Sequence, residues 1–266
     1  MQGCRVLTGL TAALLAALAS AQAEIVVAPL RQVITAKSPI ATYKISNPSD
    51  RIVEARIDWI DLTATEDGYV SATPAARAAL SAAPYLVVAP ARLRLEPGGR
   101  AEIVVRLKDG MAVPAGERRS HLLIETTPAR TPLRRASTGL EVDVGLGVST
   151  PVILRGGFAA PSTSFQNSRL ARDDIGRLVF KTTLASEGKY SAYGTITAFF
   201  EAGGKTIEVA RLTNVALYPE SGARQVSIPL LRETLPPGRL RVAFTGAGEQ
   251  AAQRYAAKDF EIAPPQ

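Results

Sequence analysis

The sequence has few residues that commonly carry out chemistry. Its 266 residues include one cysteine, Cys4, and one histidine, His121, and aromatic residues make up only 6%. A single histidine without a cysteine partner cannot build a His-rich metal site. No serine lies in a nucleophile-elbow motif, and the scattered Asp and Glu residues single out no carboxylate pair. We therefore expect no enzyme activity, no metal and no cofactor.

The chain also lacks a dense run of basic residues. Its formal net charge is +7, and the nearest thing to a basic cluster is Arg130 with Arg134 and Arg135 in an expected loop. Without basic runs or interleaved aromatics, nucleic acid is not an expected partner. The basic surface instead suits an acidic partner or an anionic chain terminus.

The N-terminal segment has the features of an export signal. Arg5 provides a positive charge, residues 6–20 are almost wholly apolar or small, and Ala21-Gln22-Ala23 is an Ala-x-Ala cleavage site. We expect a signal peptide over 1–23, an exported soluble protein beginning at Glu24, and a periplasmic location. Cys4 lies within the signal, so we expect a mature protein without disulfides that folds on its core alone.

Strand-like segments separated by turn residues predict an all-β fold, and no helical period recurs between them. The expected fold is two immunoglobulin-like β-sandwiches in an L or boomerang arrangement. Their limits are 24–155 for the first domain, 156–166 for a linker rich in Gly, Pro and Ser, and 167–266 for the second domain. One short helix is expected over Ala75–Ala83, which is rich in alanine and lies between two prolines.

The segment 140–154 holds an unusually long alternating pattern. One face of the expected strand carries five consecutive apolar positions, Leu140, Val142, Val144, Leu146 and Val148. The opposite face carries Glu141, Asp143 and two glycines. Such a strand can cover the core of its own domain, or it can lend its apolar stripe to another protein.

Several motifs, in this order and spacing, resemble the periplasmic chaperones of the pilus chaperone–usher pathway, the PapD-like family. The chain resembles divergent members of that family. In the first domain the motifs are Ile25-x-x-x-Pro29-x-Arg31, Asn47-Pro48-Ser49, Trp59, Val88-x-Pro90, Leu95-Glu96-Pro97-Gly98, Pro114-x-x-Glu117-Arg118-x-Ser120-His121-Leu122 and Pro151-Val-Ile-Leu-Arg155. In the second they are Tyr193-Gly194, Val215-x-Leu217-Tyr218-Pro219 and Pro229-Leu230.

The resemblance implies a function in pilus assembly. A chaperone of this family lends the last strand of its first domain to a pilus subunit that lacks a strand, which is donor-strand complementation. It then delivers the subunit to an outer-membrane usher. The resemblance implies that the donated residues are Leu140, Val142, Val144, Leu146 and Val148. It leaves open whether the free protein caps itself as a dimer.

The resemblance also implies roles for several arginines. Arg31 matches the arginine that, with a lysine on the donor strand, binds the carboxylate at the subunit's C-terminus. Pro151 occupies that lysine position here, so Arg118 and Arg119 are further candidates for the anchor. Arg155 matches an arginine at the domain junction. The position of its usual acidic partner holds Arg119, and that ion pair is not predicted in its usual form.

Two other classes of protein stay open at this point. One is an exported structural protein, such as a pilus subunit or an adhesion module. A pilus subunit would carry a free alternating arm at its mature N-terminus, but Pro29 interrupts the alternation there. The other is a glycan-binding or glycan-cleaving β-sandwich, which usually exposes clustered aromatic residues, and this chain has few.

Overall fold

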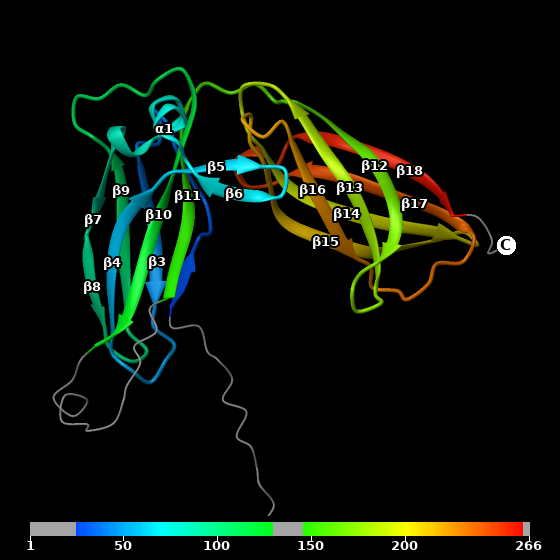
Figure 1. Cartoon of the computed structure of the whole chain (residues 1–266), viewed down its shortest axis with the longest axis horizontal. Coiled ribbons are helices and arrows are strands. Elements are labelled where there is room, and N and C mark those ends of the chain that lie inside the picture. The colour runs from blue at the N-terminus through cyan, green and yellow to red at the C-terminus, as the bar shows by residue number, and fades with distance from the viewer. Residues whose placement is uncertain (1–24, 130–145, 263–266) are drawn as a thin grey trace, which may run out of the picture.

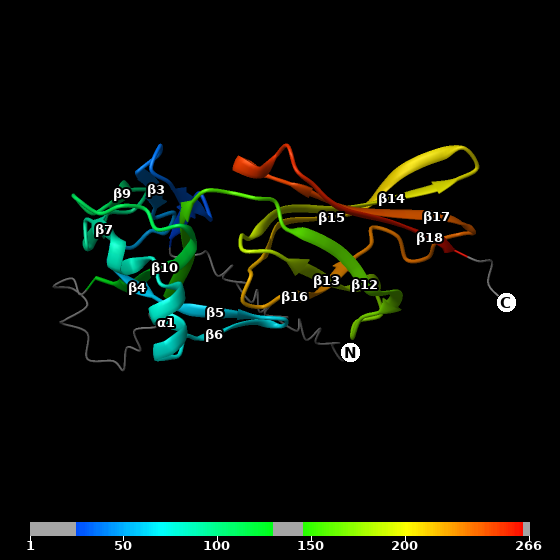
Figure 2. The same ribbon diagram turned by 90° about the horizontal axis from the view of Figure 1, so that it is seen from above.

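The computed structural model describes residues 25–129 and 146–262, and these form two β-sandwiches that lie side by side (Figure 1). Strand accounts for most of the described residues, as the sequence predicts. The strands of the second sandwich run at a large angle to those of the first, which produces the expected bent arrangement. Figure 2 shows that each domain consists of two layers of sheet.

The first sandwich contains a four-stranded and a five-stranded sheet. Its strands are β1 (Val26–Ala28), β2 (Gln32–Ile34), β3 (Ile40–Ser46), β4 (Val53–Ile60), β7 (Leu86–Ala89), β8 (Arg92–Leu95), β9 (Arg100–Leu107), β10 (Gly116–Pro128) and β11 (Leu146–Gly156). The sheet orders are β1-β3-β9-β7 and β2-β11-β10-β4-β8. Pro29, which interrupts the alternation in the sequence, separates β1 from β2, and β1 pairs with β3 while β2 pairs in parallel with β11.

The second sandwich contains a three-stranded and a four-stranded sheet. Its strands are β12 (Ser162–Arg172), β13 (Leu178–Glu187), β14 (Ala192–Ala202), β15 (Lys205–Leu217), β16 (Ala223–Pro229), β17 (Gly238–Gly246) and β18 (Arg254–Ile262). The orders are β12-β13-β16 and β15-β14-β17-β18. Strand β12 begins inside the predicted linker 156–166, because Phe165 is buried in the second core despite its polar neighbours. Only 157–161 lie between the strands.

A hairpin and three short helices complete the described elements. They are β5 (Leu62–Thr65), β6 (Gly68–Ser71), the α-helix α1 (Pro74–Leu80) and the 3-10 helices η1 (Ala83–Tyr85) and η2 (Gly248–Gln250). None of the helices in the described part of the chain is long and apolar enough to cross a membrane. Figures 1 and 2 show the β5–β6 hairpin extending from the first sandwich toward the second.

Alternation along the strands produces each core. In β3 the side chains of Ala41, Tyr43 and Ile45 are buried, while their neighbours are exposed or half-buried. In β17, Leu240, Val242 and Phe244 are buried in the same way. A strand directs successive side chains to opposite faces, so one face of each sheet supplies the core and the other faces outward.

Helix α1 is shorter than the predicted helix over 75–83. The Thr73 hydroxyl accepts a hydrogen bond from the Ala76 backbone N–H at 3.2 Å and caps the N-terminus. The Ser81 amide still donates to the Arg77 carbonyl at 2.9 Å, and the helix ends there because the two amides that follow bond elsewhere. The amides of Ala82 and Ala83 both donate to the Ser120 hydroxyl on β10, at 3.0 and 2.9 Å.

Candidate functional site

The outer edge of β11 is open over half of its described length. On one side, β11 pairs with β10 along its whole length, from Leu146 to Gly156. On the other side, β2 pairs with β11 only at 152–154. Among the described residues, no strand pairs with the outer edge of 146–151. Pro151 has no N–H, and its carbonyl accepts a hydrogen bond from the Tyr43 hydroxyl at 3.2 Å. The outward-pointing backbone groups of 146–150 can therefore pair with another chain.

The apolar stripe of β11 runs from the first core out to the surface. Val152 and Leu154 are fully buried in that core, and Val148 is half-buried and packs against it. Leu146, two residues further out on the same face, is 47% exposed. The other predicted donor residues, Leu140, Val142 and Val144, lie outside the described residues. The described part of the stripe therefore serves the core at one end and is exposed at the other.

A surface hollow of about 780 Å³ lies beside the exposed end of the stripe. Its walls come from β4, β8, β10 and β11, and include Leu146 and Gly147. Charged residues of both signs surround it, among them Arg56, Arg94 and Glu125. The sheet therefore does not cover Leu146 on this side.

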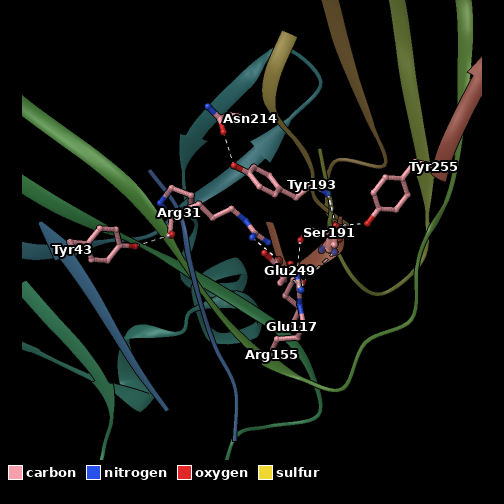
Figure 3. A network of polar contacts seen from close by, with 11 residues as sticks. Arg31, Tyr43, Glu117, Arg155, Ser191, Tyr193, Asn214, Glu249 and Tyr255 are labelled. Atoms are coloured by element: carbon pink, nitrogen blue, oxygen red, sulfur yellow. Dashed lines mark hydrogen bonds and ion pairs between the residues drawn. The ribbon is translucent and has the colours of Figure 1, made fainter. Parts of the chain in front are cut away.

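Arg155 lies between the two sandwiches in a buried ion pair (Figure 3). Its Nη2 is 2.8 Å from Glu117 Oε2, and both side chains are only 4% exposed. Glu117 on β10 is directly opposite Arg155 on β11. From the second sandwich, Arg155 Nη1 is 3.2 Å from Glu249 Oε1, and Nη2 donates to the Ser191 hydroxyl at 3.2 Å. The acidic partners of Arg155 are therefore Glu117 and Glu249.

Arg31 joins the same cluster. Its Nη1 is 2.7 Å from the same Oε1 atom of Glu249, and its guanidinium lies 4.4 Å from the centre of the Tyr193 ring. The Arg31 side chain is 6% exposed. Its Nε and Nη2 atoms are buried and have no hydrogen-bond partner among the described residues. Figure 3 shows Arg31, which directly precedes β2, and Arg155 on β11 both approaching Glu249.

Arg119 makes a second junction with the other sandwich. It forms a buried ion pair with Glu220, and its guanidinium lies 3.6 Å from the centre of the Tyr218 ring. Glu220 also accepts a hydrogen bond from the Ala64 amide at 3.2 Å. The hairpin adds a contact further out, where the Gln225 amide donates to the Glu66 carbonyl at 2.8 Å.

The structure thus brings the anchor candidate Arg31 together with the junction residue Arg155, through Glu249. The other two anchor candidates, Arg118 and Arg119, lie outside this cluster. Arg119 pairs with Glu220, and Arg118 donates to the Ala78 carbonyl on α1 at 3.2 Å. An apolar cluster lies at the same junction, in which Ile153 packs with Ala64, Ala216 and Tyr218. Alternation places Ile153 on the face of β11 away from the first core.

Sequence reasoning missed the residues that the second sandwich contributes. Glu249 in η2 and Glu220 in a turn are single acidic residues, and no local motif marks them as partners of the junction arginines. Glu117 could have been found, because it lies within a quoted motif and antiparallel pairing sets it opposite Arg155. That inference would have needed one further step, a prediction of the register between β10 and β11.

His121 does not provide a metal site within the described residues, where no group of three His, Cys, Asp or Glu side chains is placed to hold an ion. It is 3% exposed, and its ring packs edge-on against Tyr69 with centroids 5.3 Å apart. Burial, together with the positive charge of Arg119, lowers the pKa of His121 from 6.5 to about 3.

This lowered pKa predicts acid destabilisation. Between pH 6.5 and about 3 the unfolded chain protonates His121 while the folded protein does not, so protons favour unfolding. Stability should fall as the pH drops below 6.5 and should continue to fall to about pH 3. Urea-unfolding midpoints measured from pH 7 to 4 should decline less steeply in His121→Gln than in the unaltered protein. Identical slopes would contradict the prediction.

Comparisons with known proteins give structural matches only. No protein-family model matches the chain, and no curated protein matches it. Among solved structures, the chain is similar to the YadV chaperone, with 10% identity over 90% of this chain and all of that one and a TM-score of 0.46. It is similar to the CupB2 chaperone of Pseudomonas aeruginosa at 14% identity, over 90% of this chain and all of that one, with a TM-score of 0.42. A third similar structure, of the SafA pilin of Salmonella enterica with the SafB chaperone, gives 13% identity, 92% and 99% coverage and a TM-score of 0.43.

Proposed function

We propose that the protein is a periplasmic chaperone that holds exported pilus subunits by lending them a β-strand. The observation that carries the proposal is the open outer edge of β11, from which an apolar stripe emerges at Leu146. An incomplete subunit offers an unpaired strand edge and an apolar groove. The lent strand satisfies the first with backbone hydrogen bonds and fills the second with alternate side chains.

The energetics suit this function. Burial of one large aliphatic side chain stabilises a complex by about 1.5–3 kcal/mol. Five such side chains are proposed to be buried in the complex: Leu140, Val142, Val144, Leu146 and Val148. Their summed burial free energy, together with that of a ladder of backbone hydrogen bonds, exceeds the free-energy cost of association. The proposed activity is binding, with no reaction catalysed. An outer-membrane usher would then take the subunit from the chaperone.

Co-expression tests the proposal directly. Candidate exported subunits would be produced in a bacterial periplasm with and without this protein, and soluble subunit would be measured after purification through a tag on the chaperone. We expect at least one subunit to become soluble only with the chaperone and to purify with it in equal amount. If the protein itself assembles into fibres and binds no subunit, the pilus-subunit alternative replaces the proposal.

We propose that Arg31 anchors the terminal carboxylate of the bound subunit. Its buried guanidinium has donors at Nε and Nη2 with no partner in the described part of the chain, and a charge-assisted hydrogen bond contributes about 1.5–3 kcal/mol. Arg31→Ala should therefore lower the yield of chaperone–subunit complex about tenfold or more.

The matched control for this prediction is Arg254→Ala, which removes an exposed arginine from the second sandwich and should leave the yield unchanged. Thermal unfolding of both variants checks that they fold. A normal yield from folded Arg31→Ala would show that Arg31 has no anchoring role.

A further inference from the structure

Arg31 is a buried cation that uses only part of its hydrogen-bonding capacity. A guanidinium has five N–H donors, and here Nη1 is bonded to Glu249 while Nε and Nη2 have no partner among the described residues. Nε and Nη2 form one side of the guanidinium fork, which can bind both oxygens of a carboxylate through two parallel hydrogen bonds. The unused side of Arg31 therefore has the shape and charge that a carboxylate requires.

Glu249 is the most exposed member of the cluster. Its side chain is 36% exposed, against 6% for Arg31 and 4% for Arg155. The same Oε1 atom contacts both cations, at 2.7 Å for Arg31 and 3.2 Å for Arg155. If Glu249 lost its contact with Arg31, it would still have Arg155 as a partner.

The backbone around Glu249 is held in place. Its neighbour Gln250 is buried, accepts a hydrogen bond from the Tyr193 amide at 2.7 Å and donates to the Ser191 carbonyl at 3.1 Å. The Ala247 amide donates to the Tyr193 carbonyl at 3.1 Å. A change of partner at Glu249 therefore requires only a rotation of its side chain, and η2 can stay where it is.

The charges in the cluster are already balanced. Arg31 and Arg155 provide two positive charges, and Glu117 and Glu249 provide two negative charges. A third carboxylate added beside them would leave an excess negative charge in a mostly buried place, which is costly. A carboxylate from outside is therefore accommodated best when an existing one moves away.

We propose that Glu249 is an internal substitute for a partner's carboxylate. In the free protein Glu249 contacts Arg31 at Nη1. A carboxylate from a bound chain takes the other side, Nε and Nη2, and its negative charge displaces Glu249 from Nη1 and leaves Glu249 paired with Arg155. This inference rests on the proposed anchoring role of Arg31. It adds that the incoming carboxylate competes with Glu249 for Arg31. Glu249 therefore lowers the affinity of Arg31 for any carboxylate from outside.

The test uses acetate as the probe, because it carries a carboxylate and little else. The Nε–H signal of Arg31 would be followed by nitrogen-15 NMR in the purified full-length protein and assigned by its loss in Arg31→Lys. Acetate would be titrated at constant ionic strength, with acetamide as the neutral counterpart. We expect Glu249→Gln to bind acetate about tenfold more tightly than the unaltered protein, and acetamide to have no effect in either.

Glu117→Gln is the matched control, because it removes the same charge from the cluster but from a residue that contacts Arg155 and not Arg31. It should enhance acetate binding much less than Glu249→Gln. Equal acetate binding by the unaltered protein and Glu249→Gln, or equal enhancement by the two variants, would overturn the exchange. If Glu249→Gln fails to fold, Glu249→Asp keeps the charge but withdraws it from Arg31, and it must also enhance acetate binding.

The acetate test and the test of strand donation can give independent results. Acetate binding involves no subunit, so it can succeed even if no subunit binds to β11. Conversely, a subunit can be held through β11 with no exchange at Arg31. A positive acetate result with no subunit bound would retain the exchange and remove the proposed chaperone function.

Discussion

Replacing Leu146 with arginine should lower the recovery of soluble subunit at least about tenfold. In the proposed complex Leu146 fills an apolar pocket of the subunit, and loss of about 1.5–3 kcal/mol of burial already raises the dissociation constant by roughly tenfold to a hundredfold. An arginine in the same pocket adds the cost of a buried, unpaired charge. The measurement is subunit that purifies with the chaperone after co-expression.

The folding of Leu146→Arg should stay intact. Leu146 is 47% exposed and lies at the outer end of β11, beyond the fully buried Val152 and Leu154. Ile175→Arg is the matched control, because Ile175 is 74% exposed in the turn between β12 and β13 of the second sandwich. It should leave subunit recovery unchanged. Normal recovery with folded Leu146→Arg would mean that β11 is only a core strand of its own domain.

Replacing Arg155 with methionine should destabilise the protein by about 3–5 kcal/mol. The substitution leaves the Glu117 carboxylate, 4% exposed, without its cation, and an uncompensated buried charge has about this cost. It also removes a contact with Glu249 in the second sandwich. Urea unfolding measures the loss of stability, and small-angle scattering of the folded variant should show a changed arrangement of the two sandwiches.

Two further variants give this experiment its controls. Arg56→Met breaks an ion pair whose side chains are 64% and 51% exposed, so it should change stability by about 1 kcal/mol or less. The double variant Arg155→Met with Glu117→Gln removes both charges and should recover part of the lost stability. If Arg155→Met is no worse than Arg56→Met, the buried pair does not stabilise the junction.

Besides the hairpin contact at Glu66, the described part of the junction includes two polar clusters and an apolar one. Arg155 and Arg31 meet Glu249, Arg119 meets Glu220 beside Tyr218, and Ile153 packs against the second sandwich. Three of these first-domain residues lie on the neighbouring strands β10 and β11, and β11 leads to the exposed end of the stripe at Leu146. The strand proposed to bind the subunit is therefore continuous with the strand that holds the two sandwiches together.

Local patterns account for most of what could be predicted about the fold. Alternation in β3 and β17 predicts which side chains are buried, because a strand has only two faces. The turn at Asn47 is also local: its side-chain Nδ2 donates to the Arg51 carbonyl at 2.7 Å, and its Oδ1 accepts from the Ser49 amide at 3.0 Å. The first residues of β12 fall within the predicted linker 156–166, because Ser, Thr and Asn around Phe165 suggest a loop when no partner strand is known.

The sequence by itself determined the all-β class, the two sandwiches and the apolar alternation that leads into β11, because these depend on the spacing of residues along one chain. Only the tertiary structure decided which charges meet. Glu249 is more than 200 positions from Arg31, and no local pattern records that distance. The packing of one sandwich against the other places Glu249 between two arginines, where electrostatic attraction selects it as their partner.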